Sequence, residues 1–213
     1  MRVDIWSDVV CPWCYLGKRR FERALSGFAH HDEVDVVYHS FELDPRRPSE
    51  PVAKAPMLAA KLGISEAEVT ALDDRLAGLG AAEGLDYNFA GSVVGNTFDA
   101  HRVLHLARER GIQEAVTERF FRAYFTEQRS VFEAGSLAEL AAEAGLDHDE
   151  TLRVLKDGRY ADEVRADEEH ARALGATGVP FFVFDDRYGV SGAQSVENFA
   201  AVLDRAYAEP LPK

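Results

Sequence analysis

The sequence predicts an α/β fold in which a βαβ half and a ββα half are separated by a long block of helices. Strand-like runs of β-branched and aromatic residues occur near the two ends of the chain, and helical periodicity fills the middle. The 213 residues, 46% apolar and 29% charged, have the composition of an ordinary globular protein that can bury a sizeable core. We therefore expect one four-stranded sheet built from both ends of the chain.

The N-terminal half begins with a short strand at residues 3–6. A helix follows from about Cys11, where Pro12 suits the first helical position because its φ is already fixed. Apolar residues recur along this helix as far as Phe28. Residues 34–41 then form a second strand rich in β-branched and aromatic side chains. This βαβ unit predicts two parallel strands joined by a right-handed crossover.

The middle of the chain predicts a helical insertion domain. Three prolines within residues 44–51 argue against a helix or a central strand and mark a boundary. After them, Ala, Leu, Glu and Arg recur with helical period, and helix-start signals such as Ser65 followed by Glu68 appear. We expect residues 51–175 to form this domain, and residues 1–50 and 176–213 to form the sheet domain. The predicted helices are 55–62, 65–83, 97–110, 113–127, 136–144, 147–157 and 160–174.

The C-terminal half predicts a hairpin followed by a helix. Strand character returns at residues 181–184 and 188–191, with two aspartates and an arginine between them at the turn. Ser195 can cap a final helix, which Pro210 and Pro212 end.

The two cysteines of the chain, Cys11 and Cys14, lie one helical turn apart at the start of the first predicted helix. Unpaired N–H groups at a helix N-terminus favour negative charge, and the thiolate is the nucleophile in disulfide exchange. Cys11 is therefore the better placed attacker. Cys14, with its Cβ atom about 5–6 Å away, is placed to resolve a mixed disulfide. Half of a zinc site, or two inert thiols, are the alternatives that this spacing leaves open.

The net charge of −13 argues against general affinity for nucleic acids or anionic membranes, because both would repel the protein. Met1 leads directly into the first strand without a charged leader and an apolar run, and no later segment is long enough to span a bilayer. We therefore expect a cytoplasmic protein. In that reducing compartment a Cys-x-x-Cys pair is catalytic or metal-binding more often than structural.

Four motifs occur in order along nearly the whole chain. They run from Ser7 to Gly17, from Asn96 to Arg102, from Gly178 to Phe182, and from Ser191 to Gln194. Together they resemble the DsbA superfamily, and within it the FrnE-like thiol-disulfide oxidoreductases. The superfamily also contains the 2-hydroxychromene-2-carboxylate isomerases and the kappa-class glutathione transferases. The resemblance implies a thioredoxin fold with a large all-helical insertion.

The resemblance also implies substrate-binding residues. Pro12 and Trp13 lie between the cysteines, and a loop with a cis Val179–Pro180 bond is implied to pack beside them. There the Val179 backbone can bond to an extended substrate segment.

A second implied group, Phe98, His101 and Arg102, lies near a groove between the domains. The residues alone predict a helix capped by Asn96 or Thr97, with His101 and His105 on one partly buried face. The i,i+4 spacing of these histidines also allows a zinc site with the two cysteines, although nothing in the sequence brings these elements together.

The leading functional prediction is a cytoplasmic thiol-disulfide oxidoreductase that exchanges a Cys11–Cys14 disulfide with a thiol- or disulfide-containing protein or small molecule. It implies no tightly bound cofactor, with glutathione as a redox partner or co-substrate. One alternative is a glutathione-dependent isomerase or transferase acting on an aromatic or polyketide-type substrate. Those relatives typically have serine at the position of Cys11, which argues against this alternative. The other alternative is a peptide-binding chaperone or zinc-binding module.

Overall fold

The structure, a computed structural model, describes residues 1–209, which form two compact units. One unit contains Met1–Leu43 and the chain from Asp162 onward, and the other contains Asp44–Ala161. The predicted boundaries followed residues 50 and 175, so the two divisions differ at residues 44–50 and 162–175. Pro210 and Pro212, which we expected to end the last helix, lie outside the described residues.

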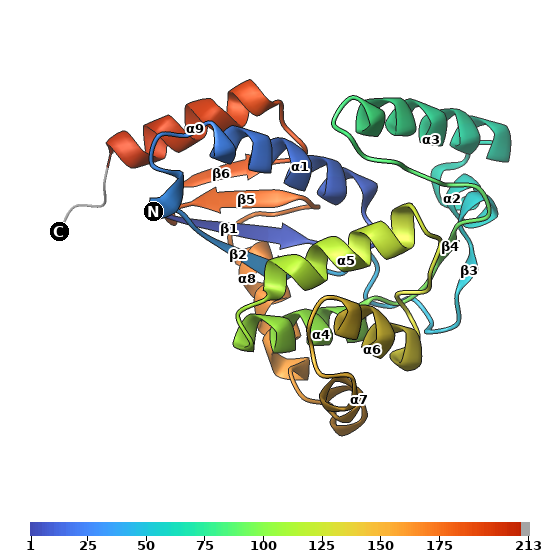
Figure 1. The fold of residues 1–213 in the computed structure, drawn as a ribbon. Helices are drawn as coiled ribbons and strands as arrows, with labels where there is room; N and C mark the ends of the chain where they lie inside the picture. The colour runs from blue at the N-terminus through green and yellow to red at the C-terminus, as the bar shows by residue number, and fades with distance from the viewer. Residues whose placement is uncertain (210–213) are drawn as a thin grey trace. The chain divides into compact units, whose positions relative to one another are not determined.

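The first unit is built on a four-stranded sheet in the order β2-β1-β5-β6 (Figure 1). Its strands are β1 (Arg2–Ser7), β2 (Asp35–Ser40), β5 (Phe181–Phe184) and β6 (Tyr188–Ser191). The predicted parallel pairing of β1 with β2 and the predicted β5–β6 hairpin are both confirmed. Because β1 also pairs antiparallel with β5, the two ends of the chain share one sheet.

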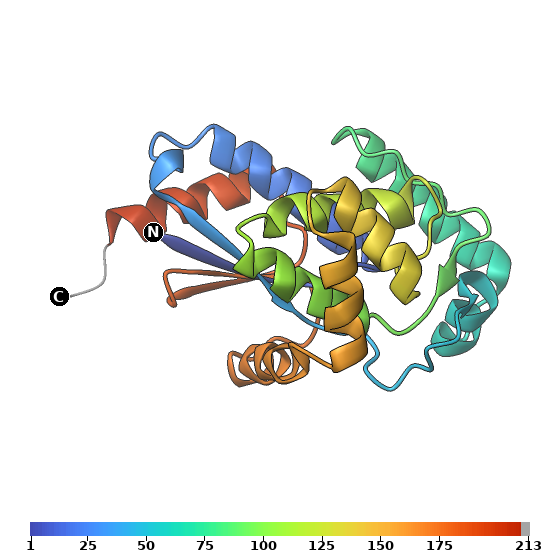
Figure 2. The ribbon, with the colours of Figure 1, turned by 60° about the horizontal axis from the view of Figure 1, so that its bottom comes forward.

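Helices cover both faces of this sheet. On one face lie α1 (Pro12–Ser26) and α9 (Val196–Ala208), and on the other lies α8 (Ala161–Ala173) (Figures 1 and 2). A short 3₁₀ helix, η1 (His31–Glu33), precedes β2. The core beneath α1 and α9 includes Val3, Ile5, Phe21, Phe28, Phe182, Phe184, Phe199 and Leu203.

The alternation of side chains along β1 turns every second residue toward α8. Trp6 is buried on this face with Ala171, Phe181 and Val183. This packing places α8 in the sheet unit. In the sequence, its helical period was indistinguishable from that of the insertion, so the boundary was predicted after α8 instead of before it.

A buried charged cluster joins α8 to the same face of the sheet. His39 Nε2 lies 2.6 Å from Asp4 Oδ1, and His39 Nδ1 lies 2.7 Å from Asp167 Oδ1. Asp167 also accepts the Ser40 N–H at 2.8 Å and, through its carbonyl oxygen, the Trp6 indole N–H at 2.9 Å. With a carboxylate at each ring nitrogen, both nitrogens donate when His39 is protonated. The cluster is therefore best satisfied with a charged imidazolium.

The electrostatics of this cluster agree with its geometry. Burial acts to lower the pKa of His39, but the hydrogen bonds with Asp167 and Asp4 raise it above its ordinary value. Burial likewise acts to raise the pKa of Asp4, but hydrogen bonds from His39 and Arg2 bring it below its ordinary value. The proton of His39 is thus held more tightly in the folded chain than in the unfolded chain.

The second unit is mostly helical. Its helices are α2 (Lys54–Leu62), α3 (Glu66–Ala81), α4 (Phe98–Glu109), α5 (Gln113–Phe125), α6 (Ala134–Glu143) and α7 (His148–Asp157). The predicted capping box of Ser65 and Glu68 is confirmed. An antiparallel pair, β3 (Val52–Ala53) with β4 (Val93–Val94), was not predicted. Strands of two residues are too short to show any period in sequence.

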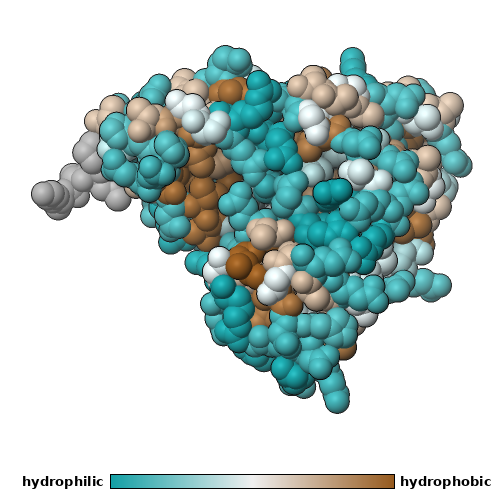
Figure 3. Space-filling view, viewed as in Figure 1, coloured by the Kyte–Doolittle hydropathy of each residue, from teal (hydrophilic) through white to brown (hydrophobic). Residues whose placement is uncertain are grey.

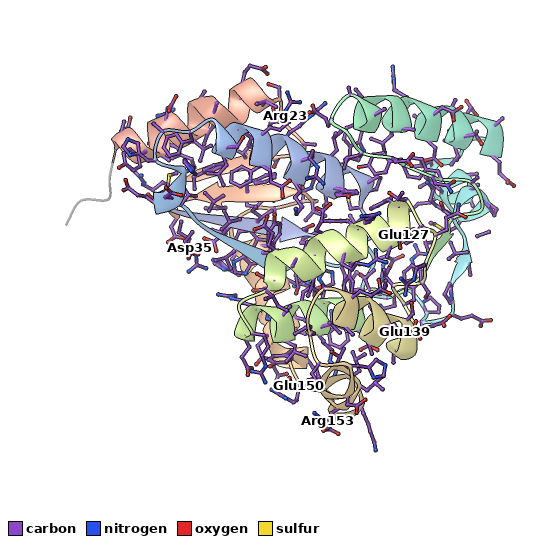
Figure 4. All side chains as sticks on the ribbon, in the orientation of Figure 1. Arg23, Asp35, Glu127, Glu139, Glu150 and Arg153 are labelled. Atoms are coloured by element: carbon purple, nitrogen blue, oxygen red, sulfur yellow. The ribbon has the colours of Figure 1, made fainter. Side chains whose placement is uncertain are left out.

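The surface of the second unit carries networks of opposite charges. Arg119 pairs with Glu127 at 2.5 Å and with Glu143 at 2.7 Å, and Arg129 lies 3.6 Å from Glu139. Glu127 and Glu139 are labelled in Figure 4. Exposed pairs of this kind contribute about 0–1 kcal/mol each.

The face of the molecule in Figure 3 is largely polar, with apolar residues in small separate patches. Over residues 1–209, no helix is both long and apolar enough to cross a membrane.

The His39 cluster predicts a stability that falls with rising pH. Below about pH 6.5, folded and unfolded chains both carry the His39 proton and its stabilising contribution is fully present. As the pH rises through the raised folded pKa, the proton is lost and this contribution disappears. Denaturant unfolding between about pH 6 and pH 9 should show this decrease.

The variant His39→Gln should flatten this pH dependence, because it has no proton to lose in that range. The matched control is His148→Gln, since the His148 side chain is 45% exposed and pairs with its neighbour Asp149 at the protein surface. A pH dependence that is the same in His39→Gln as in the unsubstituted protein would contradict the role of the cluster.

Candidate active site

The candidate site begins where β1 ends and α1 starts. A turn after Ser7 leads to Cys11, whose N–H donates to the Asp8 carbonyl at 3.0 Å. Cys11 is the N-cap residue of α1, with an extended backbone at φ −91° and ψ 110°, and Pro12 follows in the first turn. The first turn of α1 contains no acidic residue, so the positive end of the helix dipole acts on the cysteine pair. The predicted placement of Cys11 at the helix N-terminus is therefore confirmed.

Cys11 and Cys14 are both present as free, buried thiols. The Cys14 N–H donates to the Cys11 carbonyl at 3.0 Å, within the first turn of the helix. The peptide bond between Val179 and Pro180 is cis, as expected. The Cys11 sulfur lies 3.6 Å from the Val179 carbonyl oxygen and donates to it. The structure thus brings together the two motifs that the sequence placed at opposite ends of the chain.

The Cys14 thiol is held in its protonated form. Burial raises the pKa of Cys14 well above its ordinary value, and the hydrogen bond and charge of Cys11 add to this rise. Hydrogen bonds from the Asp8 backbone and the Ser7 side chain act in the opposite direction, because they favour the thiolate. Ser7 and Asp8 are thus direct partners of the site, a role that the sequence did not assign to them. The signal was a pair of polar residues directly before an otherwise apolar active-site turn.

Apolar side chains are exposed in the same unit. Trp13, between the cysteines, is 45% exposed, and Leu43, just after β2, is 44% exposed. The Leu43 N–H donates to the Asp8 carboxylate at 2.8 Å, so Leu43 is attached to the turn that carries Cys11. Leu43 was not predicted as a site residue. Both of these exposed apolar side chains belong to the sheet unit.

The other predicted site residues lie on α4 of the helical unit. Asn96 accepts the Phe98 N–H at 2.9 Å, so its side chain, and not that of Thr97, bonds at the start of this helix. His101 and Arg102 are both buried. A role of Phe98, His101 and Arg102 in substrate binding stays a prediction.

The guanidinium of Arg102 has structural partners within the helical unit. It donates to the Arg159 carbonyl at 2.7 Å and to the Asp99 carboxylate at 2.7 Å. It also bonds to the carbonyls of Val154 and Leu155 near the end of α7. Arg102 thereby satisfies carbonyls that have no partner within that helix.

A zinc site of the kind that the sequence allows requires the two cysteines and the two histidines of α4 as ligands. Cys11 and Cys14 belong to the sheet unit, and His101 and His105 belong to the helical unit. In residues 1–209, no three His, Cys, Asp or Glu side chains are grouped so as to hold a metal ion.

The sequence and the fold of this chain are similar to those of known proteins. The family model described as a DSBA-like thioredoxin domain matches residues 2–204. A crystal structure of a probable DsbA oxidoreductase from Streptomyces coelicolor is 53% identical, with a TM-score of 0.97, covering 100% of this chain and 92% of that one. The uncharacterized protein YwbO of Bacillus subtilis is 29% identical over 95% of this chain and 96% of its own length.

A more distant structure shares the fold. It is the cytosolic disulfide reductase DsbM from Pseudomonas aeruginosa with GSH, which is 21% identical with a TM-score of 0.70. The match covers 98% of this chain and all of that chain.

The difference between the two cysteines predicts unequal alkylation. In the reduced protein near neutral pH, the thiol that remains in Cys11→Ser should react with iodoacetamide at least about tenfold more slowly than the thiol that remains in Cys14→Ser. The reason is that only the thiolate reacts and the pKa of Cys14 is raised by burial. Mass spectrometry of the time course measures both rates, and equal rates would contradict the assignment of Cys14 as the protonated partner.

Proposed function

The chain belongs to the family of DSBA-like thioredoxin domains, and from this premise we propose that it is a cytoplasmic thiol-disulfide oxidoreductase in which Cys11 attacks and Cys14 resolves. The observation that carries the proposal is the position of Cys11. Its sulfur lies at the N-terminus of α1, one turn before Cys14 and 3.6 Å from the Val179 carbonyl. A thiolate at this place is favoured by the helix dipole and is adjacent to a backbone that can bind substrate.

In the reducing direction, the Cys11 thiolate attacks one sulfur of a substrate disulfide. A mixed disulfide forms, and the other substrate sulfur leaves as a thiolate, which can take up the proton of Cys14. The Cys14 thiolate then attacks the Cys11 sulfur, releases the second substrate thiolate and leaves a Cys11–Cys14 disulfide. Two electrons pass from the cysteine pair to the substrate, and oxidation of a dithiol follows the same steps in reverse.

The raised pKa of Cys14 fits the order of these steps. While Cys14 is protonated it does not compete with Cys11 for the incoming disulfide, because the thiolate is the attacking species. When it loses its proton, the hydrogen bonds from Ser7 and the Asp8 backbone are available to the thiolate. Cys14 is therefore suited to the second step.

We propose that the substrate is a thiol- or disulfide-containing protein segment or small molecule. An extended segment can pair with the Val179 backbone next to Pro180, while exposed Trp13, following Pro12, offers it apolar contact. Phe98, His101 and Arg102 are proposed as further residues near the substrate. Because the Arg102 donors already bond to Asp99 and to backbone carbonyls, its proposed part is to hold α4 in position.

Glutathione is proposed as the redox partner, with no tightly bound cofactor. The support is the fold shared with the cytosolic disulfide reductase whose structure includes GSH, and the same likeness supports the cytoplasmic location. Glutathione would reduce the Cys11–Cys14 disulfide by the same exchange chemistry. The second candidate function, a glutathione-dependent isomerase or transferase, draws on this likeness too, but Cys11 stands where serine is typical of that class.

Cys14→Ala should accumulate mixed disulfides on Cys11, because the resolving thiol has been removed. Cys11→Ser should accumulate none and should lose thiol-disulfide exchange activity. The double variant is the matched control for capture through non-covalent contacts. The measurement is mass spectrometry of molecules released by reductant after incubation with a cell extract.

The captured molecules distinguish the candidate functions. Protein disulfides on Cys11 support the oxidoreductase. Glutathione or a small metabolite alone would favour the glutathione-dependent isomerase or transferase. Exchange activity that survives in Cys11→Ser would contradict the proposed mechanism.

The dipeptide between the cysteines predicts a protein less oxidising than DsbA. Strongly oxidising DsbA proteins have a histidine there, whereas this chain has Pro12 and Trp13, so one partner that stabilises the thiolate is missing. The reduction potential should therefore lie below about −120 mV. Equilibration in glutathione buffers measures it, and a value at or above that of DsbA would refute this ranking.

Trp13→His tests the cause of this difference. An imidazolium beside Cys11 stabilises the thiolate and hence the reduced form, so the potential should become less negative. Trp13→Gln removes the indole without adding a titratable group and is the matched control. Equal shifts in both variants would show that loss of tryptophan, and not gain of histidine, sets the potential.

A further inference from the structure

We propose that the turn at residues 191–194 is a positioning element, fastened to α1 through Gly17 and Arg20, that holds Pro180 and the Val179 carbonyl beside Cys11. This inference rests on the proposed function. It assigns a role to the fourth sequence motif, which the exchange mechanism does not use.

The first observation is a close approach at Gly17. A Cβ atom added there would lie 3.0 Å from Pro180 Cγ, 3.4 Å from Ala193 Cα and 3.5 Å from Ala193 Cβ. Glycine within a helix costs about 1 kcal/mol relative to alanine. Because the neighbours fill the space of a side chain, the absence of a Cβ is what lets the Pro180 ring and the turn contact α1 directly.

The second observation is a pair of hydrogen bonds on either side of this contact. Arg20 Nη1 donates to the Ala193 carbonyl at 2.9 Å, one helical turn beyond Gly17. The Gly192 N–H donates to the Pro180 carbonyl at 2.8 Å. Gly192 has a φ of +81°, a conformation that favours glycine. The turn is therefore bonded to α1 through Ala193 and to the loop before β5 through Gly192.

The third observation is a set of hydrogen bonds within the turn and between the turn and α9. The Gln194 N–H donates to the Gly192 carbonyl at 2.9 Å, and its side-chain amide donates to the Ser191 carbonyl at 2.8 Å. The Asn198 amide donates to Gln194 Oε1 at 3.1 Å, and Ser195 caps α9 by accepting the Asn198 N–H. The turn is thus continuous with β6 on one side and with α9 on the other.

These contacts link the two parts of the candidate site. α1 carries Cys11 at its start, and Gly17 and Arg20 lie about two turns and two and a half turns later on the same helix. The turn connects this helix to Pro180 and so fixes where the Val179 carbonyl stands relative to the Cys11 sulfur. An extended peptide that pairs with the Val179 backbone depends on that position. A small disulfide, which needs only the sulfur, depends on it much less.

The test is Gly17→Ala, with Gly78→Ala as the matched control. Gly78 lies within α3, and a Cβ added there meets nothing within 4 Å, so both variants make the same chemical change within a helix. Two readouts are used: amide hydrogen exchange at Gly192, and the ratio of kcat/KM for a disulfide-bonded extended peptide to kcat/KM for 2-hydroxyethyl disulfide.

In Gly17→Ala, exchange at the Gly192 amide should be about tenfold faster, because its bond to Pro180 is displaced. The ratio of the two kcat/KM values should fall about tenfold through a higher KM for the peptide, the effect of losing one or two backbone hydrogen bonds. Gly78→Ala should change neither readout. Arg20→Met should change both readouts in the same direction as Gly17→Ala. Arg20→Lys, which keeps a donor for the Ala193 carbonyl, should change both readouts less than Arg20→Met does.

The two readouts separate the inference from the proposed function. Unchanged Gly192 exchange and an unchanged ratio in Gly17→Ala or, if that variant does not fold, in Arg20→Met would overturn the positioning role. If the unsubstituted protein exchanges neither disulfide, the proposed function fails. Faster Gly192 exchange in the variant would still show that Gly17 holds the turn.

Discussion

The site depends on the contact between the Cys11 sulfur and the Val179 carbonyl, which joins residues 168 positions apart in the chain. This contact requires the first strand and the strand after Pro180 to be neighbours, and the antiparallel pairing of β1 with β5 makes them so. The helical unit is inserted between these strands in sequence, yet their pairing joins the N-terminal and C-terminal strands in one sheet. Both faces of the sheet are then covered by helices, which fixes the start of α1.

Burial disfavours the charged form of a side chain at two places in the sheet unit, but the resulting protonation states differ. At Cys14 it raises the pKa of an acid that has few compensating partners, so the thiol stays neutral. At His39 and Asp4 the opposing charges outweigh burial, and both groups stay charged. A sulfur that must ionise during exchange is thus buried with only the Ser7 side chain and the Asp8 backbone favouring its thiolate, while a cluster that favours charged His39 and Asp4 joins α8 to the other face of the sheet.

Much of the local structure was predictable. The strands, the seven middle helices and the Ser65 cap follow from periodicity and capping residues, which act over a few neighbouring positions. The small β3–β4 pair was missed because two residues carry no period. The helix α8 was itself predicted, but its grouping with the sheet unit differs from the predicted division, because its contacts with Trp6 and His39 come from distant strands. The contacts of Ser7 and Asp8 with Cys14 depend on the conformation of the turn between them, and the close approach of Pro180 to Gly17 depends on a residue far away in the chain.

By itself the sequence determined the order of elements and the placement of two cysteines one turn apart at the start of a helix. These are local properties, set by backbone preferences, side-chain period and the geometry of a single turn. Only the tertiary structure decided that the Val179 carbonyl faces Cys11, that Pro180 fills the space beside Gly17, and that His39 lies between two aspartates. Contacts of this kind join residues far apart in the chain, and their energies depend on burial and distance, which no local pattern specifies.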